Sequence, residues 1–186
     1  MKNVIVTAGY FNKKPLKELC KYIDAANIDL KALSDKFYRD VCSATLKSVL
    51  DSMVTVKSSG VHLEVTNLLL PTMNDSDKDI KALCKWIKEN LGPEVPLHFS
   101  RFFPQYRMKN LPPTSFETLK KARSIAKDTG IQYVYIGNVI GKSWENTFCP
   151  RCKKELILRH GYTVEKNVIK HGKCPYCGYK IYGVWN

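Results

Sequence analysis

The sequence predicts an α/β fold of about five parallel strands, followed by a small metal-binding module at the C-terminus. Three observations predict it. Short β-branched runs alternate with amphipathic helical stretches over the first 142 residues, which is typical of parallel βα units. Two Cys-Pro-x-Cys sequences lie near the end of the chain. The length of 186 residues and the hydrophobic content of 44% suit one domain with a core and a small appendage. We therefore expect a partial βα barrel over residues 1–142 and a four-cysteine module over residues 143–186.

Five runs of apolar and β-branched residues have the length of strands. The predicted strands are Val4–Thr7, Ala25–Leu30, His62–Leu69, Leu97–Arg101 and Gln132–Ile136. Since helical crossovers usually cover a parallel sheet, we expect the sheet to be buried on both faces.

Four helical segments separate these strands. They are predicted over Pro15–Tyr22, Ser34–Ser58, Asp75–Asn90 and Ser115–Thr129. Asn74-Asp75-Ser76 supplies N-cap residues for the third helix, and Gly92 ends it. Pro112-Pro113-Thr114 fixes the entry to the fourth helix and offers the Thr114 hydroxyl as a cap, while Gly130 ends that helix.

The C-terminal module is predicted to consist of short antiparallel hairpins. Gly141–Asn146 has the composition of a linker and places the domain boundary near Ser143. A first hairpin turns at His160-Gly161 between 156–158 and 162–164, and a second turns at His171-Gly172.

Cys149, Cys152, Cys174 and Cys177 have the spacing of a tetrahedral four-thiolate metal site. Zinc is the expected ion, and iron in a rubredoxin-like site is the alternative, because thiolate spacing does not choose between them. A disulfide pair is disfavoured by the odd total of seven cysteines and by the absence of a secretory leader before them, which favours a reducing cytoplasm. Because closed thiolate coordination leaves no open position, the site is expected to be structural.

The remaining cysteines and the nearby histidines are expected to play no part in metal binding. Cys20, Cys42 and Cys84 lie on predicted helices at unrelated spacings and should be core residues. His160 and His171 lie in turns beside a ligand set that is already complete.

The chain carries a formal net charge of +13, and the region from residue 149 onward holds eight Lys or Arg against two Glu. A basic tail could bind nucleic acid, but basic composition without clustered aromatic residues is a weak signal, and a solvated lysine surface is favoured. The longest apolar stretches, such as Val65–Leu70, are far shorter than a membrane span, so no membrane association is expected.

Several strand-end sequences together resemble those of a known group. They are Val6-Thr7-Ala8-Gly9-Tyr10, Asn27-Ile28-Asp29-Leu30-Lys31, Leu63-Glu64-Val65-Thr66 through Pro71 with Asn74-Asp75, and His98-Phe99-Ser100-Arg101-Phe102 with Pro104. They resemble the radical S-adenosylmethionine (SAM) activating enzymes related to pyruvate formate-lyase-activating enzyme. The similarity is greatest to the AmmeMemoRadiSam branch, through Tyr135–Val139, Glu145-Asn146-Thr147, a Cys-Pro-x-Cys sequence and a terminal Gly-Val-Trp. The match runs nearly end to end here but corresponds to the later half of such an enzyme.

The resemblance implies a SAM site at the carboxyl ends of the strands. Asp29 and Lys31 lie two residues apart, on one face of the second strand, and would contact SAM through ribose hydroxyls and an anionic group. A solvent-facing ion pair is the alternative for these two residues. Thr7 and Gly9 would border the same cofactor, with Gly9 permitting close backbone approach, although Ala8 departs from the amide usual in relatives.

Other residues near the strand ends are candidate substrate contacts. His98 shares a face with Ser100, and Arg101 is expected to point to the other face. Tyr106, Arg107 and Lys109 could contact a protein substrate, although a solvated basic loop is the commoner explanation.

The sequence contains no Cys-x3-Cys-x2-Cys, the spacing that would hold a [4Fe-4S] cluster with one open iron. We therefore expect the chain alone not to cleave SAM reductively, and SAM and the cluster to require a missing N-terminal barrel half. That half, or self-association along the first strand, would cover the sheet edge. The sequence leaves open whether the chain is truncated, split or an engineered fragment. A non-catalytic basic zinc ribbon that binds nucleic acid or protein is the alternative function.

Overall fold

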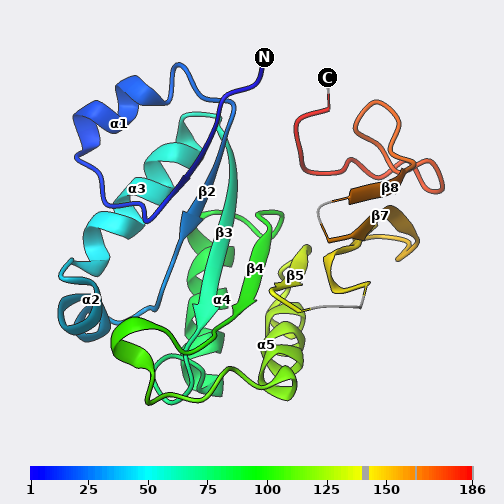
Figure 1. Cartoon of the computed structure of the whole chain (residues 1–186). Helices are drawn as coiled ribbons and strands as arrows, with labels where there is room; N and C mark the ends of the chain where they lie inside the picture. Colours follow the sequence, from blue (N-terminus) through cyan, green and yellow to red (C-terminus); the bar gives the residue numbers. More distant parts are fainter. Residues whose placement is uncertain (140–142, 162, 186) are drawn as a thin grey trace.

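A computed structural model describes residues 1–139, 143–161 and 163–185. Its centre is a five-stranded parallel sheet in which neighbours in sequence are neighbours in space, in the order β1-β2-β3-β4-β5 (Figure 1). The strands are β1 (Val4–Thr7), β2 (Ala25–Asp29), β3 (His62–Leu69), β4 (Leu97–Arg101) and β5 (Val134–Gly137). Three of these ranges agree with the predicted strands, β2 ends one residue earlier, and β5 begins and ends slightly later.

The helices follow the βα alternation that the sequence predicts. They are α1 (Lys13–Leu19), α2 (Asp35–Cys42), α3 (Leu46–Ser58), α4 (Asp77–Asn90) and α5 (Phe116–Thr129). A 3₁₀ turn, η1 (Tyr106–Met108), lies in the loop after β4. The side chains of Ser34, Ser76 and Ser115 cap α2, α4 and α5 by accepting backbone N–H groups.

Two helix predictions need correction. The single helix expected over Ser34–Ser58 is two helices, because Ser43 adopts a left-handed conformation (φ 50°) that ends α2. Thr114 does not cap α5, since Ser115 does. The Thr114 hydroxyl instead donates to the Leu69 carbonyl and accepts from the Phe102 N–H, which ties together the ends of β3 and β4.

The expectation that both faces of the sheet are buried is wrong. Burial alternates along β2, β3 and β4, so one face is covered and the other is only half-buried. With strands in consecutive order, right-handed crossovers place every helix on the same side. Figure 1 shows the five α-helices on that side, so no α-helix of the described residues covers the opposite, inner face.

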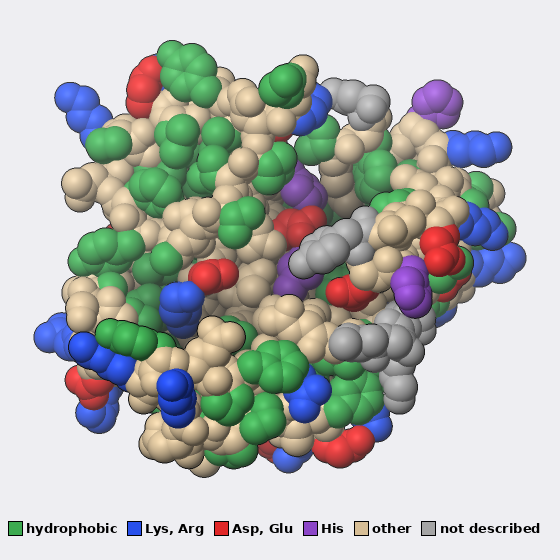
Figure 2. Space-filling view, in the orientation of Figure 1, with side chains coloured by type: hydrophobic (Ala, Val, Ile, Leu, Met, Phe, Trp, Pro, Cys, Tyr) green, Lys and Arg blue, Asp and Glu red, His purple; other side chains and the backbone are tan. Residues whose placement is uncertain are grey.

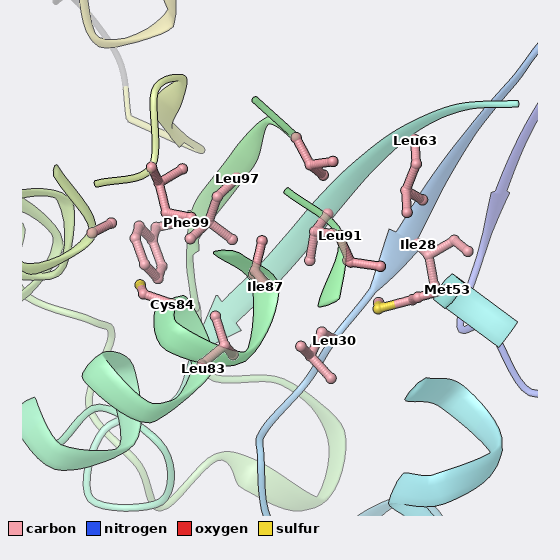
Figure 3. Packing of buried hydrophobic residues seen from close by; sticks show 14 of the residues in the cluster. Ile28, Leu30, Met53, Leu63, Leu83, Cys84, Ile87, Leu91, Leu97 and Phe99 are labelled. Carbon is pink, nitrogen blue, oxygen red and sulfur yellow. The ribbon is translucent and has the colours of Figure 1, made fainter. Parts of the chain in front are cut away.

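The main core lies between the sheet and its helices. Ile28, Leu63 and Phe99 point from the sheet toward Met53 of α3 and Cys84 of α4 (Figure 3). The cysteines predicted to be core residues are buried at positions 20 and 84, and partly buried at position 42.

The inner face carries mostly polar side chains arranged in rows by the strand register. Asp29, Thr66, His98 and Tyr135 pair successively across four strands and form one row. Figure 2 shows histidine and acidic side chains gathered in a hollow at the centre of this face.

The C-terminal module forms a separate three-stranded antiparallel sheet of β6 (Thr147–Phe148), β7 (Glu155–His160) and β8 (Thr163–Asn167). The first predicted hairpin corresponds to β7–β8, although Tyr162 lies outside the described residues. Lys170 and Lys173 pair across the second predicted turn. Positions 141 and 142 of the predicted linker, and with them the predicted end of the first domain, lie outside the described residues. The next three residues form a 3₁₀ turn, η2 (Ser143–Glu145).

The module packs against the sheet through its C-terminal tail. Its hydrophobic core includes Tyr133, which precedes β5, together with Ile157 and Ile181. Lys2 and Trp185 line one cavity, so the two ends of the described chain lie at the same end of the molecule, as Figure 1 also shows.

Among the helices that the structure describes, none has both the length and the apolar character needed to cross a bilayer.

Candidate functional site: four thiolates and a polar inner face

The four cysteines predicted as ligands converge on one point. The Sγ atoms of Cys149, Cys152, Cys174 and Cys177 all lie within 4.8 Å of one another. The Cys149–Cys177 and Cys152–Cys174 sulfur pairs are 3.6 and 3.7 Å apart. A tetrahedron with metal–sulfur bonds of about 2.3 Å has edges of about 3.8 Å, so the four sulfurs fit a bound metal ion.

The two Cys-Pro-x-Cys turns also supply backbone N–H groups to the sulfurs. The N–H of Cys152 donates to Sγ of Cys149 at 3.5 Å. Burial would raise the pKa of Cys174, but the N–H groups of Tyr176 and Cys177 outweigh it and lower that pKa to about 7. At Cys149 burial outweighs its N–H donors and raises the pKa, so the donors favour the thiolate, the form that binds a metal, at Cys174. His160 and His171 are not members of the ligand group.

Asp29 and Lys31 lie together at the carboxyl end of β2, as the sequence predicts. Their side chains form an ion pair with Nζ of Lys31 2.9 Å from Oδ2 of Asp29, and each is about one-third exposed. Asp29 lies in the inner-face row with Thr66 and His98. The pair is therefore accessible from the inner face. It is also consistent with the alternative interpretation, a solvent-facing ion pair without a ligand.

The backbone of Lys31 is held by three buried side chains, of which only Asn74 is named in a sequence pattern described above. Its N–H donates to the hydroxyl of Tyr38 at 3.0 Å. Its carbonyl accepts from the side-chain amides of Asn67 at 3.1 Å and Asn74 at 2.6 Å. Burial raises the pKa of Tyr38 to about 12, which keeps the hydroxyl neutral. Both hydrogen-bonding groups of Lys31 are thus fixed where the chain leaves the sheet.

Thr7 and Gly9 lie at the end of the neighbouring strand but do not point to the inner face. The register pairs Thr7 with Ile28, on the helix-covered side. Gly9 has φ +74°, and a Cβ there would approach Cγ2 of Ile28 to 2.6 Å. Packing and backbone conformation therefore account for this glycine, and its contact with a cofactor stays a prediction.

A histidine–glutamate–histidine array lies on the inner face, and His98 is its only member that is a candidate from the sequence alone. Oε1 of Glu64 is 3.1 Å from Nε2 of His62, and Oε2 is 2.7 Å from Nε2 of His98. Burial opposes ionisation of Glu64, but the two hydrogen bonds outweigh it and hold its pKa well below the usual range. The signal in the sequence was the alternation His62-x-Glu64 on a strand, which places both residues on one face.

The remaining candidates lie at the rim and beyond it. Nε of Arg101 donates to the Thr114 carbonyl, and its guanidinium lies over the ring of Phe103. Tyr106 is exposed, and the guanidinium of Arg107 lies 5.3 Å from its ring centroid. A protein contact at this loop stays a prediction.

Comparison with known proteins gives relatives that are longer than this chain. No family model matches it. An uncharacterized protein of Methanocaldococcus jannaschii, MJ0808, is 45% identical over 183 residues, 97% of this chain and 54% of that protein. The pyruvate formate-lyase-activating enzyme of Clostridium pasteurianum is 24% identical over 134 residues, 67% of this chain and 56% of the enzyme. The chain thus spans about half the length of these curated relatives.

Solved structures show the same architecture. A domain of a pyruvate-formate lyase-activating enzyme from Bacteroides vulgatus matches with a TM-score of 0.63 at 17% identity, over 74% of this chain and 82% of that one. Streptococcus suis SuiB bound to SAM matches with a TM-score of 0.59 at 14% identity, over 74% and 33% of the two chains. These similarities, the parallel α/β sheet and the four-cysteine group show that the chain has part of a radical SAM barrel as its fold and resembles pyruvate formate-lyase-activating enzymes.

Proposed function

We propose that this chain forms one part of the SAM-binding barrel of a radical SAM enzyme similar to pyruvate formate-lyase-activating enzyme. The observation that supports this most strongly is the Asp29–Lys31 pair. It lies at the carboxyl end of a barrel strand, where ligands gather in such folds, with the backbone of Lys31 fixed by three buried side chains. A bound ligand would take ribose hydroxyls to Asp29 and an anionic group to Lys31, in place of their mutual ion pair. Thr7 and Gly9 would contribute the adjacent strand end.

The four-cysteine module is proposed to hold zinc in a structural role. Its sulfur separations fit a closed tetrahedral site, and all four positions are filled by protein ligands. The tail of the module reaches the base of β3, so the ion would also support the position of the module against the sheet.

Radical chemistry is proposed to require a further segment that carries the cluster. The 186 residues contain no Cys-x3-Cys-x2-Cys, and the matched regions cover only 54% and 56% of the two relatives. The edge strand β1 could accept that segment, because Val4 and Val6 expose apolar side chains on the inner face. Pairing of two copies through β1 is the alternative arrangement.

SAM binding can be tested with the chain coexpressed with the part of the Methanocaldococcus relative that it does not match, after anaerobic reconstitution. Equilibrium dialysis with labelled SAM should show tighter binding to this complex than to Asp29→Asn in the same complex. Asp40→Asn, which changes an exposed carboxylate paired with Lys36 on α2, is the matched control and should bind like the unchanged complex. Equal affinity for all three would contradict a role for Asp29.

A second experiment, on the isolated chain, tests whether radical chemistry requires a further segment. With iron, sulfide and reductant supplied, it should give neither a cubane spectrum nor 5′-deoxyadenosine. Production of 5′-deoxyadenosine by the isolated chain would overturn the requirement for a further segment. Steeply salt-dependent nucleic-acid binding, lost when Lys166, Lys170 and Lys173 are neutralised, without SAM affinity in either form, would instead favour the basic-ribbon function.

A further inference from the structure

A hollow on the inner face lies between the sheet and the C-terminal module and has no role in the proposal above. Its volume is about 260 Å³. Glu64, His98, Tyr135 and Gly137 line it from the sheet, and Glu145 and Arg159 line it from the module.

The ring nitrogens of His98 have distinct roles because of Glu64. The ionised Glu64 carboxylate only accepts hydrogen bonds, so Nε2 of His98, 2.7 Å away, must carry a proton. In the neutral imidazole, Nδ1 then holds the free lone pair. Among the described residues, none makes a hydrogen bond to Nδ1, and the side chain is 28% exposed.

The orientation of the imidazole ring is fixed by a chain of contacts that reaches the module. The ring stacks on Tyr135 with centroids 4.9 Å apart and an interplanar angle of 24°. The Tyr135 hydroxyl lies 2.9 Å from Oγ1 of Thr147, and an N–H of Arg159 donates to the same Thr147 oxygen at 2.9 Å. An acceptor held this firmly is suited to recognising a ligand, because little rotamer freedom remains to be lost on binding.

The array is not arranged to bind a metal ion. Within the described parts of the chain, the four cysteines are the only group of three or more ligating side chains whose donor atoms all lie within 4.8 Å. Both oxygens of Glu64 are instead occupied by imidazole N–H groups. Nδ1 of His98 therefore remains the acceptor that the array offers to a ligand.

The charges around the hollow favour a ligand that donates hydrogen bonds. Glu64 and Glu145 contribute two carboxylates. The one guanidinium is that of Arg159, whose Nη1 donates to the Glu145 carbonyl at 2.7 Å and to Oγ1 of Thr147 at 2.9 Å. Two carboxylates against one guanidinium give the lining an excess of negative charge, which disfavours an anionic ligand.

We propose that the hollow is a ligand-binding site in which Nδ1 of His98 accepts a hydrogen bond from an ammonium or hydroxyl group of a compact ligand. Glu64 acts as the positioning residue that fixes the tautomer of His98. The site lies in the same row of the sheet as Asp29 but two strands away, and its existence does not depend on SAM binding.

Nuclear magnetic resonance of the zinc-loaded 186-residue chain labelled with ¹⁵N-histidine tests the proposal. At a pH where His98 is neutral, its resonances should show a single tautomer with the proton on Nε2. Ethanolamine, which carries both donor groups, should shift the Nδ1 resonance saturably, whereas acetate should not. The exposed His171 is the internal control and should respond to neither probe.

Two variants separate the hollow from the tautomer. Gly137→Leu should abolish the ethanolamine shift and leave the tautomer unchanged, because a Cβ at this position meets only Ser100 Oγ, at an ordinary 3.5 Å, and the larger side chain fills the hollow. Glu64→Gln should give a mixture of tautomers. Gly137→Ala, the smaller change, should retain the shift.

Three results would overturn the proposal: no saturable shift with ethanolamine, an equal shift with acetate, or an unchanged shift in Gly137→Leu. If a folded Glu64→Gln variant kept the single Nε2–H tautomer, Glu64 would not be the residue that fixes the tautomer of His98. A cooperative thermal unfolding transition establishes that each variant is folded. If Glu64→Gln does not fold, Gly137→Leu and Gly137→Ala still test the site.

Discussion

At the scale of single residues, Glu64 shows how two hydrogen bonds can outweigh the cost of burying a charge. Partial burial of its carboxylate favours the neutral form. His62 and His98 each donate a hydrogen bond to one carboxylate oxygen, and these bonds favour the charged form. Since the pKa of Glu64 is lower in the folded chain than its ordinary value of 4.5, the folded state is stabilised above that pH.

This stabilisation should be lost as the pH falls below about 4.5 toward the folded-state pKa, because the unfolded chain then binds a proton that the folded chain does not. Urea unfolding at several pH values should show that the difference in unfolding free energy between the unchanged chain and Glu64→Gln shrinks between pH 6 and pH 3. The difference reports Glu64 together with the two histidines that it contacts, whereas the metal site is common to both proteins and cancels. Glu117→Gln, an exposed carboxylate paired with Lys120, is the control and should give a nearly constant difference. A difference for Glu64→Gln that is equally constant would contradict the assignment.

At the scale of elements, the sequence predicted the alternation of strands and helices well because local patterns encode it. Apolar runs with β-branched residues located β1, β3 and β4 to the residue. The pattern could not locate the break between α2 and α3, since the helical periodicity continues through it and Ser43 is not a residue that usually signals a left-handed end. It also could not predict the open inner face, which follows from strand order and therefore from the whole fold.

The candidate site was predictable only in part, for a related reason. Spacing alone identified the four cysteines, because two short turns fix each pair of ligands locally. The spacing of Asp29 and Lys31, two residues apart on a strand, likewise predicted that their side chains lie together. The hydrogen bonds of Asn67 and Asn74 to Lys31, and of Glu64 to His98, join residues more than 30 positions apart, so local patterns do not reveal them. The alternation His62-x-Glu64 indicates only that Glu64 shares a face with His62.

The left-handed end of α2 permits a direct test at this scale. A non-glycine residue in this conformation costs roughly 1 kcal/mol, so Ser43→Gly should raise the unfolding free energy by about 0.5–1 kcal/mol, less the added flexibility of the unfolded chain. Ser124→Gly, at an exposed position inside α5, should lower it by about 0.5–1 kcal/mol. Urea unfolding of both variants measures the two effects. A loss of stability in Ser43→Gly would mean that the serine side chain contributes more than the strained backbone costs.

At the scale of the whole molecule, the metal module and the sheet share hydrogen bonds as well as a hydrophobic core. The first residue of β3 that pairs with β4 is Val65, opposite Leu97, so the backbone at Leu63 has no strand neighbour on that side. The Tyr182 hydroxyl takes that place, accepting from the Leu63 N–H at 3.2 Å and donating to its carbonyl at 3.5 Å. The Tyr182 ring also lies beside His62, with centroids 4.7 Å apart.

Removal of the metal should therefore speed hydrogen exchange at the start of β3. Because the module is too small for a large core, loss of its metal should unfold it and withdraw Tyr182, and the Leu63 amide should then exchange its hydrogen rapidly. The Val65 amide, bonded to the Pro96 carbonyl, should stay protected. Hydrogen exchange before and after chelation measures both, and Tyr182→Phe with the metal retained should expose the Leu63 amide alone. If chelation released the metal and left Leu63 protected, the module would hold its place against the sheet without the ion, and the proposed structural role of zinc would be confined to the thiolate turns themselves.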